Sequence, residues 1–129
     1  MTPHIAYITI VVDDYDAAIT FYTSKLGFDL IENTELNNSK RWVVVAPNGS
    51  QCKILLAKAS NEDQRSRVGN QTGGRVFLFL HTDNFNRDYQ ALVENGVEIV
   101  RNPSKEAYGT VAVFKDLYGN LWDLVEPVT

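Results

Sequence analysis

The stretch AYITIVVDDYDAAITFYTSKLG, residues 6–27, contains the two patterns that decide the fold. Residues 6–12 are apolar and mostly β-branched, which predicts a buried strand. The pattern then changes to that of a helix, which Asp13 or Asp14 can cap and which Gly27 ends. The apolar residues of this second part fall on one helical face: Ile19, Tyr22 and Leu26. The stretch therefore predicts a strand followed by a helix.

The rest of the chain adds three strands to this beginning and then repeats the order. Strands are predicted at 28–36, 41–47 and 51–59, the last two joined by the turn PNGS. The second half predicts a strand, a capped helix and three strands, at 75–81, 83–96, 97–103, 109–116 and 120–126. Each half therefore has the order βαβββ.

The spacing of matching residues indicates an internal duplication. The separation between Asp14 and Asp83 is nearly equal to the separation between Gly49 and Gly119. A single βαβββ module leaves one face of its sheet uncovered, so two modules are expected to pack together as a curved mixed sheet around a central cavity. The sequence therefore predicts an α+β fold with a ligand site at the junction of the modules.

The segment between the halves, residues 60–74, is polar, charged and rich in glycine. It predicts a linker or mobile loop, and a loop of this length can act as a lid over the cavity. It contains no G-x-G-x-x-G motif after a strand, so it does not indicate nucleotide binding. At 129 residues the chain is expected to form one domain, with module 1 at about 1–59 and module 2 at about 75–129.

Composition narrows the possible classes of function and location. There are 12 Lys and Arg against 16 Asp and Glu, a net charge of −4 without a basic cluster, which argues against nucleic-acid binding. No apolar run approaches the roughly 20 residues of a membrane helix, and the N-terminus lacks the pattern of a signal peptide. The single Cys52 cannot form an internal disulfide. We expect a cytoplasmic protein without a membrane or nucleic-acid partner.

Two motifs resemble those of a known superfamily. VVDDYDAAITFYTSKLGF (11–28) looks like the helix-bearing signature of the vicinal oxygen chelate superfamily, and FKDLYGNLWDLVE (114–126) resembles its closing D-x-x-G-N-x-x-[ED]-L-x-E hairpin. That superfamily contains glyoxalase I, fosfomycin and bleomycin resistance proteins, and extradiol dioxygenases. The resemblance spans nearly the whole chain and implies the same two-module fold, but this fold supports lyases, epimerases, oxygenases and simple binding proteins.

The resemblance also indicates where enzymes of the superfamily hold their metal ion. The corresponding positions here are Tyr7, Lys53, Arg75 or Val76, and Asp123, and only Asp123 has a matching donor. A divalent ion needs three or more N, O or S donors. We therefore expect no metal ion and no other cofactor, although a divalent metal stays a disfavoured alternative.

The carboxylate of Asp123 in an otherwise apolar strand has two explanations that do not involve a metal. It is either held by Lys53 or backbone donors, or it binds a polar group of a ligand. A Lys53–Asp123 pair across the cavity would give a buried carboxylate the partner it needs. Glu126, near the end of the same strand, is expected to be solvated.

Strand alternation selects the residues that face the cavity. Counted from Tyr7, Lys53 and Asp123, it places Thr9 and Leu55 inside as well. Most of the aromatic side chains, Phe114 among them, are expected to pack in the core. Some of them must line the cavity, because neighbouring residues of a strand alternate between its two sides. The expected ligand-binding set is Tyr7, Thr9, Trp42, Lys53, Leu55, Phe77, Phe79, Tyr108 and Asp123. Tyr7 fits a core tyrosine and a pocket-lining residue equally well.

Two functions follow from these residues. The first is a small-molecule-binding protein of the glyoxalase/bleomycin resistance family, without the metal site and acting as a homodimer, as many relatives of that family do. The alternative is an enzyme, either a glyoxalase-like lyase or isomerase or another member acting on a small organic substrate. Catalytic residues are unknown; Tyr7, His81 and Asp123 are the candidates for proton transfer, although a lone His is more often structural.

Overall fold

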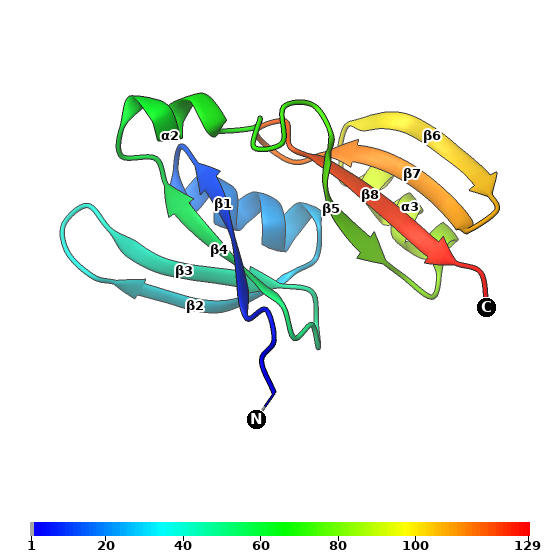
Figure 1. The fold of residues 1–129 in the computed structure, drawn as a ribbon, viewed down its shortest axis with the longest axis horizontal. Helices are drawn as coiled ribbons and strands as arrows, with labels where there is room; N and C mark the ends of the chain where they lie inside the picture. The colour runs from blue at the N-terminus through cyan, green and yellow to red at the C-terminus, as the bar shows by residue number, and fades with distance from the viewer. Residues whose placement is uncertain (1) are drawn as a thin grey trace. The chain divides into compact units, whose positions relative to one another are not determined.

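A computed structural model describes residues 2–129, and it divides the chain into two compact units that meet between Val68 and Gly69. Each unit contains one four-stranded sheet and a helix that covers it (Figure 1). The predicted α+β fold of two βαβββ modules is thus confirmed.

The first unit begins with β1 and the helix that follows it. Its elements are β1 (Tyr7–Val12), α1 (Tyr15–Thr20), η1 (Phe21–Lys25), β2 (Asp29–Glu35), β3 (Arg41–Ala46), β4 (Lys53–Lys58) and α2 (Glu62–Arg67). The strand order in the sheet is β1-β4-β3-β2, with β1 parallel to β4 and the other pairs antiparallel.

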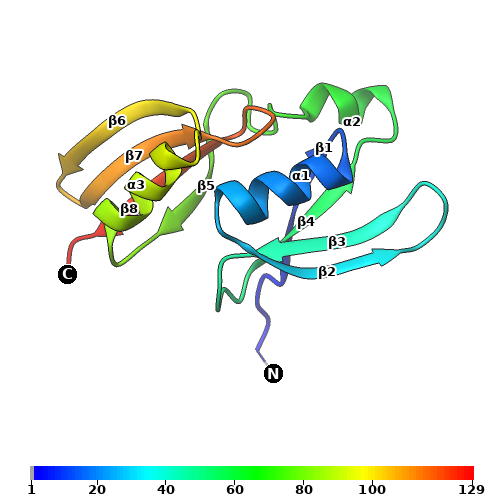
Figure 2. The same cartoon turned by 180° about the vertical axis from the view of Figure 1, so that it is seen from behind.

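The second unit repeats this arrangement. Its elements are β5 (Val76–His81), α3 (Phe85–Glu94), β6 (Ile99–Glu106), β7 (Gly109–Lys115) and β8 (Leu121–Pro127). The sheet order is β5-β8-β7-β6, again with one parallel pair, β5 and β8. In both units the helix that follows the first strand lies on one face of the sheet (Figure 2).

The two covering helices begin at equivalent polar caps. Asp14 accepts a hydrogen bond from the Ala17 N–H at 2.7 Å, and Asn84 accepts one from the Arg87 N–H at 3.1 Å. The prediction that Asp83 corresponds to Asp14 was wrong, because the residue in the cap position is Asn84. With Asn84 as the cap, the separation of the two caps equals that of Gly49 and Gly119.

The first helix is one residue longer between its cap and its closing glycine than the second. The separation between the caps Asp14 and Asn84 is one position larger than the separation between the closing glycines Gly27 and Gly96. The last turns of the first helix, η1, are π-helical, while α3 is regular. A π-helical turn takes up one extra residue without breaking the helix, so both helices still end at a glycine with positive φ, 72° and 76°.

The segment at 60–74 is not wholly a loop, contrary to the prediction. Residues 62–67 form α2, because Asn61 caps the Gln64 N–H at 2.8 Å and the Gln64 side chain accepts a hydrogen bond from the Ser60 N–H at 2.8 Å. These reciprocal bonds satisfy two N–H groups at the start of the helix. Acidic residues in the first turn and basic ones in the last complement the helix dipole. The Gly-rich composition of 69–74 hid this short helix.

The chain enters the second unit in close contact with its β7–β8 turn. Gly69 has a φ of 73°, and a Cβ there would lie 1.9 Å from the carbonyl oxygen of Tyr118. Two residues later, the Gln71 N–H donates to Asn120 Oδ1 at 3.4 Å. Only glycine fits at Gly69 without moving this turn.

The apolar core of each unit lies between the sheet and its helix. In the first unit, the buried strand residues on the helix side are Ile10, Val12, Val43, Val45, Ile54 and Leu56. In the second, Phe114 and Trp122 stack at 5.9 Å and are exposed by no more than 2%. As the alternation predicts, residues between these project to the opposite face.

Candidate functional site

In the first unit, the sheet face away from α1 carries five of the residues expected to bind a ligand. Tyr7 lies beside Lys53, and Thr9 beside Leu55, in the parallel pairing of β1 and β4. The rings of Tyr7 and Trp42 meet edge to face, with centroids 5.8 Å apart. Tyr7 is 47% exposed, which does not fit the core alternative. This face therefore presents an aromatic pair next to an ammonium group.

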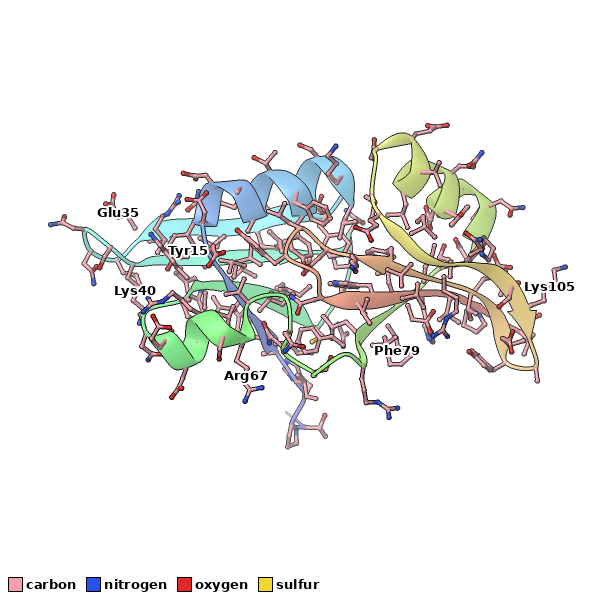
Figure 3. The ribbon with its side chains drawn as sticks, turned by 90° about the horizontal axis from the view of Figure 1, so that it is seen from above. Tyr15, Glu35, Lys40, Arg67, Phe79 and Lys105 are labelled. Carbon is pink, nitrogen blue, oxygen red and sulfur yellow. The ribbon has the colours of Figure 1, made fainter. Side chains whose placement is uncertain are left out.

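In the second unit, the corresponding face carries a row of paired residues across the sheet. Phe79 on β5 pairs with Asp123 on β8, Asp123 with Val113 on β7, and Val113 with Arg101 on β6. Residues in such a row project to the same face. Phe79 is 64% exposed and lies on the side of the sheet away from α3 (Figure 3).

Asp123 is the most unusual side chain of this row. It is 8% exposed, and among residues 2–129 its Oδ1 atom has no hydrogen-bond partner. Burial raises the pKa of the Asp123 carboxyl above its usual value, and the positive charges of Arg101 and His81 oppose this shift. The group therefore takes a proton more readily than an exposed aspartate.

The pairing of Lys53 with Asp123 is not tested and stays a prediction. Lys53 belongs to the first unit and Asp123 to the second, and each unit is described by itself.

Phe77 and Tyr108 complete the residues that were expected to bind a ligand. Phe77 lies at an irregularity of β5, between Val76 and Leu78, and is half-buried. Tyr108 lies between β6 and β7 and is 58% exposed. Both are in the second unit with Asp123, but neither is among the residues that pair with Asp123 across the sheet.

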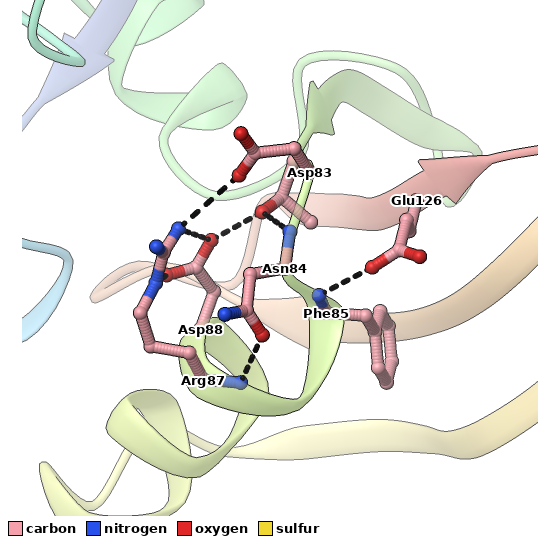
Figure 4. Close-up of polar contacts among 7 residues, drawn as sticks. Asp83, Asn84, Phe85, Arg87, Asp88 and Glu126 are labelled. Atoms are coloured by element: carbon pink, nitrogen blue, oxygen red, sulfur yellow. Dashed lines mark hydrogen bonds and ion pairs between the residues drawn. The ribbon is translucent and has the colours of Figure 1, made fainter. Parts of the chain in front are cut away.

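Glu126 is not simply solvated, as the sequence suggested. Its Oε1 atom accepts a hydrogen bond from the Phe85 N–H at 2.7 Å, at the start of α3 (Figure 4). The Asn84 side chain caps the same helix, and Thr82 donates to Asp88. Glu126 thus ties β8 to the helix, and a carboxylate is favourable at a helix N-terminus.

The D-x-x-G-N part of the closing motif builds the β7–β8 turn. Asp116 Oδ1 accepts hydrogen bonds at 2.9–3.0 Å from the N–H groups of Tyr118, Gly119 and Asn120. Asp116 Oδ2 accepts a fourth, at 2.9 Å, from the Asn120 side chain. Asp116 and Asn120 are 5% and 3% exposed, so this network is a buried structural element.

The four positions that correspond to metal ligands do not offer a metal-binding donor set. The sequence alone suggested Arg75 or Val76 for the third position; counted back seven residues from the Asn84 cap, it is Phe77. The positions thus hold a phenol, an ammonium group, a phenyl ring and one carboxylate: Tyr7, Lys53, Phe77 and Asp123. Across residues 2–129, no group of three or more His, Cys, Asp or Glu side chains is placed to hold an ion.

Sequence reasoning missed two features of the second unit. Arg101 escaped notice because β6 has two register irregularities around it, which break the simple alternation. The other feature is a groove of about 620 Å³ between α3 and β6. Its wall includes Phe85 and Tyr89, whose rings stack at 5.6 Å. Their spacing of four residues on a predicted helix was a usable signal.

No helix within residues 2–129 is long and apolar enough to cross a membrane.

Comparison with known proteins gives consistent matches over nearly the full length. The family model for the Glyoxalase/Bleomycin resistance protein/Dioxygenase superfamily matches residues 4–124. An uncharacterized protein of Shewanella frigidimarina (strain NCIMB 400) is 56% identical over 128 residues, which cover 98% of this chain and 95% of that protein.

Two solved structures are similar in both fold and sequence. UcmS2 is 31% identical, with a TM-score of 0.85 over 98% of this chain and 99% of its own. TnmS3, an antibiotic binding protein from Streptomyces sp. CB03234, is 28% identical, with a TM-score of 0.82 over 98% of each chain. Together with the family model and the two βαβββ units, these matches show that the chain belongs to the Glyoxalase/Bleomycin resistance protein/Dioxygenase superfamily.

Proposed function

We propose that the protein binds a small, planar, partly aromatic organic molecule and does so without a metal ion. The observation that carries this proposal is the exposure of aromatic rings on the sheet faces that the helices leave uncovered. Tyr7, at 47%, meets Trp42 edge to face, and Phe79 is 64% exposed. Aromatic side chains with a few polar groups suit such ligands.

The polar groups on these faces support binding over metal-dependent chemistry. Lys53 and Asp123 stand at positions where enzymes of the superfamily would need metal ligands. An ammonium group repels a cation and cannot serve as a ligand while protonated. The description of TnmS3 as an antibiotic binding protein supports the same class of function.

The test of binding is a thermal-shift screen of planar aromatic compounds, followed by calorimetric titration of those that raise Tm. The expected result is saturable binding that Trp42→Ala or Phe79→Ala weakens by about threefold to tenfold, since an aromatic contact contributes ~0.5–1.5 kcal/mol beyond its buried area. Tyr89→Ala, in the groove beside α3, is the control and should leave affinity unchanged. Binding that only Tyr89→Ala weakens, or no hit in the screen, would contradict the proposal.

The metal-free part of the proposal has its own measurement. The purified protein is exposed to excess Ni²⁺, Zn²⁺, Mn²⁺ and Fe²⁺, free ion is removed, and bound metal is measured by elemental analysis. We expect far less than one ion per chain. Near-stoichiometric metal that Asp123→Ala abolishes would refute this.

An enzymatic role is a second candidate because burial raises the pKa of Asp123, which suits a group that transfers protons. Its test is turnover of adducts between methylglyoxal and a thiol, measured for the wild type and for Asp123→Asn. Turnover that Asp123→Asn abolishes would favour the enzyme, a lyase or isomerase, over a binding protein.

We also propose that the protein works as a homodimer in the cytoplasm. The edge strand β2 is exposed along its length, with Leu30 and Ile31 at 43% and 48%, and a second copy would cover these side chains. Light scattering at micromolar concentration should give twice the monomer mass of 14.5 kDa. A monomer mass would contradict the dimer.

A further inference from the structure

We infer that Asp123 Oδ1 selects the ligand: it accepts a hydrogen bond from a neutral O–H or N–H group carried by an aromatic ring that lies against Phe79. The inference rests on the proposed binding function and adds the chemical class of the ligand.

The first support is the unpartnered oxygen itself. Asp123 is 8% exposed, and no donor within residues 2–129 pairs with its Oδ1 atom. Burying an acceptor without a donor costs free energy, so such atoms are rare in native proteins and need a reason. A ligand donor at this position would remove that cost.

The second support is the neighbour that Asp123 has on β5. Phe79 pairs with Asp123 in the parallel register, so the two side chains project from adjacent strands to the same face, about 5 Å apart at their backbones. The Phe79 ring is 64% exposed. A flat ligand resting on this ring would bring a substituent at its edge to the Asp123 side chain, and the side chains that bury Oδ1 would have to shift for the two to meet.

The third support is the sign of the surrounding charges. Arg101 on β6 belongs to the same row of paired residues as Asp123, and its positive charge acts on the Asp123 carboxyl. Lys115 on β7, whose partner Leu121 is on the same face as Asp123, is paired with Glu98 at 3.5 Å. The Lys115 charge is thus already balanced, and the charge of Arg101 opposes a cationic ligand. The donor that fits is therefore neutral, such as a phenol, an enol or an amide N–H.

The experiment compares 2-naphthol with 2-methoxynaphthalene, in which a methyl group replaces the hydroxyl hydrogen and removes the donor, titrated by calorimetry at pH 7. The wild-type protein should bind 2-naphthol about tenfold more tightly, because a hydrogen bond to a charged group contributes at least ~1.4 kcal/mol. In Asp123→Leu this preference should vanish, with the affinity for 2-methoxynaphthalene unchanged or higher. Asp123→Asn, which retains an acceptor oxygen, should keep part of the preference.

The outcomes separate this inference from the proposed function. Equal binding of the two naphthalenes to the wild type overturns the inference and leaves aromatic binding intact. A preference that Tyr89→Ala removes and Asp123→Leu does not also overturn it, since the groove beside α3 would then hold the ligand. If neither compound binds while other aromatic compounds raise Tm, the choice of Asp123 as the acceptor is wrong. A failure of all aromatic compounds removes the proposed function as well.

Discussion

Lys53 in the first unit and Asp123 in the second hold the same position in the repeat, four residues after the glycine of a turn. Both project from the last strand of the βαβββ order to the face away from the helix. One is an ammonium group beside an aromatic pair, and the other is a buried carboxylate beside an exposed phenylalanine. The helix-side residues of both units are apolar. The duplicated units thus keep the same packing and differ in the chemistry of the open face.

The turns that precede Lys53 and Asp123 differ in the same way. In the second unit, Asp116 accepts four hydrogen bonds in a buried turn. The residue at the corresponding position of the first unit is Ala46, and that turn is closed by the Ser50 N–H donating to the Pro47 carbonyl at 3.0 Å. Each unit therefore forms the same hairpin with different hydrogen bonds. Substitutions in the two turns should therefore have different effects on stability.

The largest effect is expected from Asp116→Ala, which gives the second turn the residue of the first. The N–H groups of Tyr118 and Asn120 would lose the carboxylate that accepts from them, as would the Asn120 side chain, while the Gly119 N–H would keep the Asp116 carbonyl at 3.2 Å. The free energy of unfolding should therefore fall by about 3 kcal/mol and Tm by roughly 10 °C. Urea denaturation and calorimetry measure this. The control is Asn48→Ala in the exposed turn of the first unit, which should cost less than about 0.5 kcal/mol. A similar small cost for Asp116→Ala would show that the two turns are equivalent.

The next effect should come from Gly69→Ala, because the new Cβ would meet the Tyr118 carbonyl oxygen of the same turn. We expect a loss of about 2–3 kcal/mol, which combines this clash with the strain of a positive φ. Gly73→Ala is the matched control: its φ is 67°, but nothing lies within 4 Å of the added Cβ, so only the strain of about 1 kcal/mol should remain. Equal losses for the two variants would mean that Gly69 does not pack against the turn.

Asp123→Asn should stabilise the protein, in contrast to the two preceding changes. The raised pKa means that the folded state binds this proton more tightly than the unfolded state, so stability falls as pH rises from the usual value of 3.8 through the folded pKa. At pH 7 the substitution should therefore raise the free energy of unfolding by about 1 kcal/mol, with little difference near pH 3. Thermal unfolding at both pH values checks this. A lower Tm for Asp123→Asn at pH 7 would indicate that the carboxylate has a partner.

Asp88 in the same unit should show the opposite dependence on pH, with the smallest effect. Its hydrogen bond from Arg87 lowers its pKa. Its contribution to stability is therefore present above the usual value of 3.8 and is lost as pH falls through the folded pKa. Because the pair is partly exposed, Asp88→Asn should cost only a few tenths of a kcal/mol at pH 7, shown by urea titrations at pH 7 and pH 2.5. A cost that persists at pH 2.5 would have to come from something other than the charge.

Much of the fold follows from the sequence because strand alternation and helix periodicity are strong in this chain. The strands, the Asp14 cap and the helix-side core were all predictable from local patterns. The contacts that join distant segments were not. Glu126 reaches the Phe85 N–H 41 residues away, and no local pattern reports such a bond. Arg101 was missed for a related reason, since the irregular pairing of β6 decides which way it projects.

The π-helical turn at Phe21–Lys25 indicates where the two halves of the chain came to differ in length. The offset between the two units is one position larger when it is counted from cap to cap than when it is counted between the glycines that end the helices. The difference arises inside the helix, and the π-helical turn is the form an α-helix takes when one residue is inserted into it. When the two halves are aligned as descendants of one ancestral segment, the gap inside the helix therefore belongs within Phe21–Lys25, and a second, compensating gap lies between the glycines that end the helices and the turn glycines Gly49 and Gly119. The loops before the helices need none.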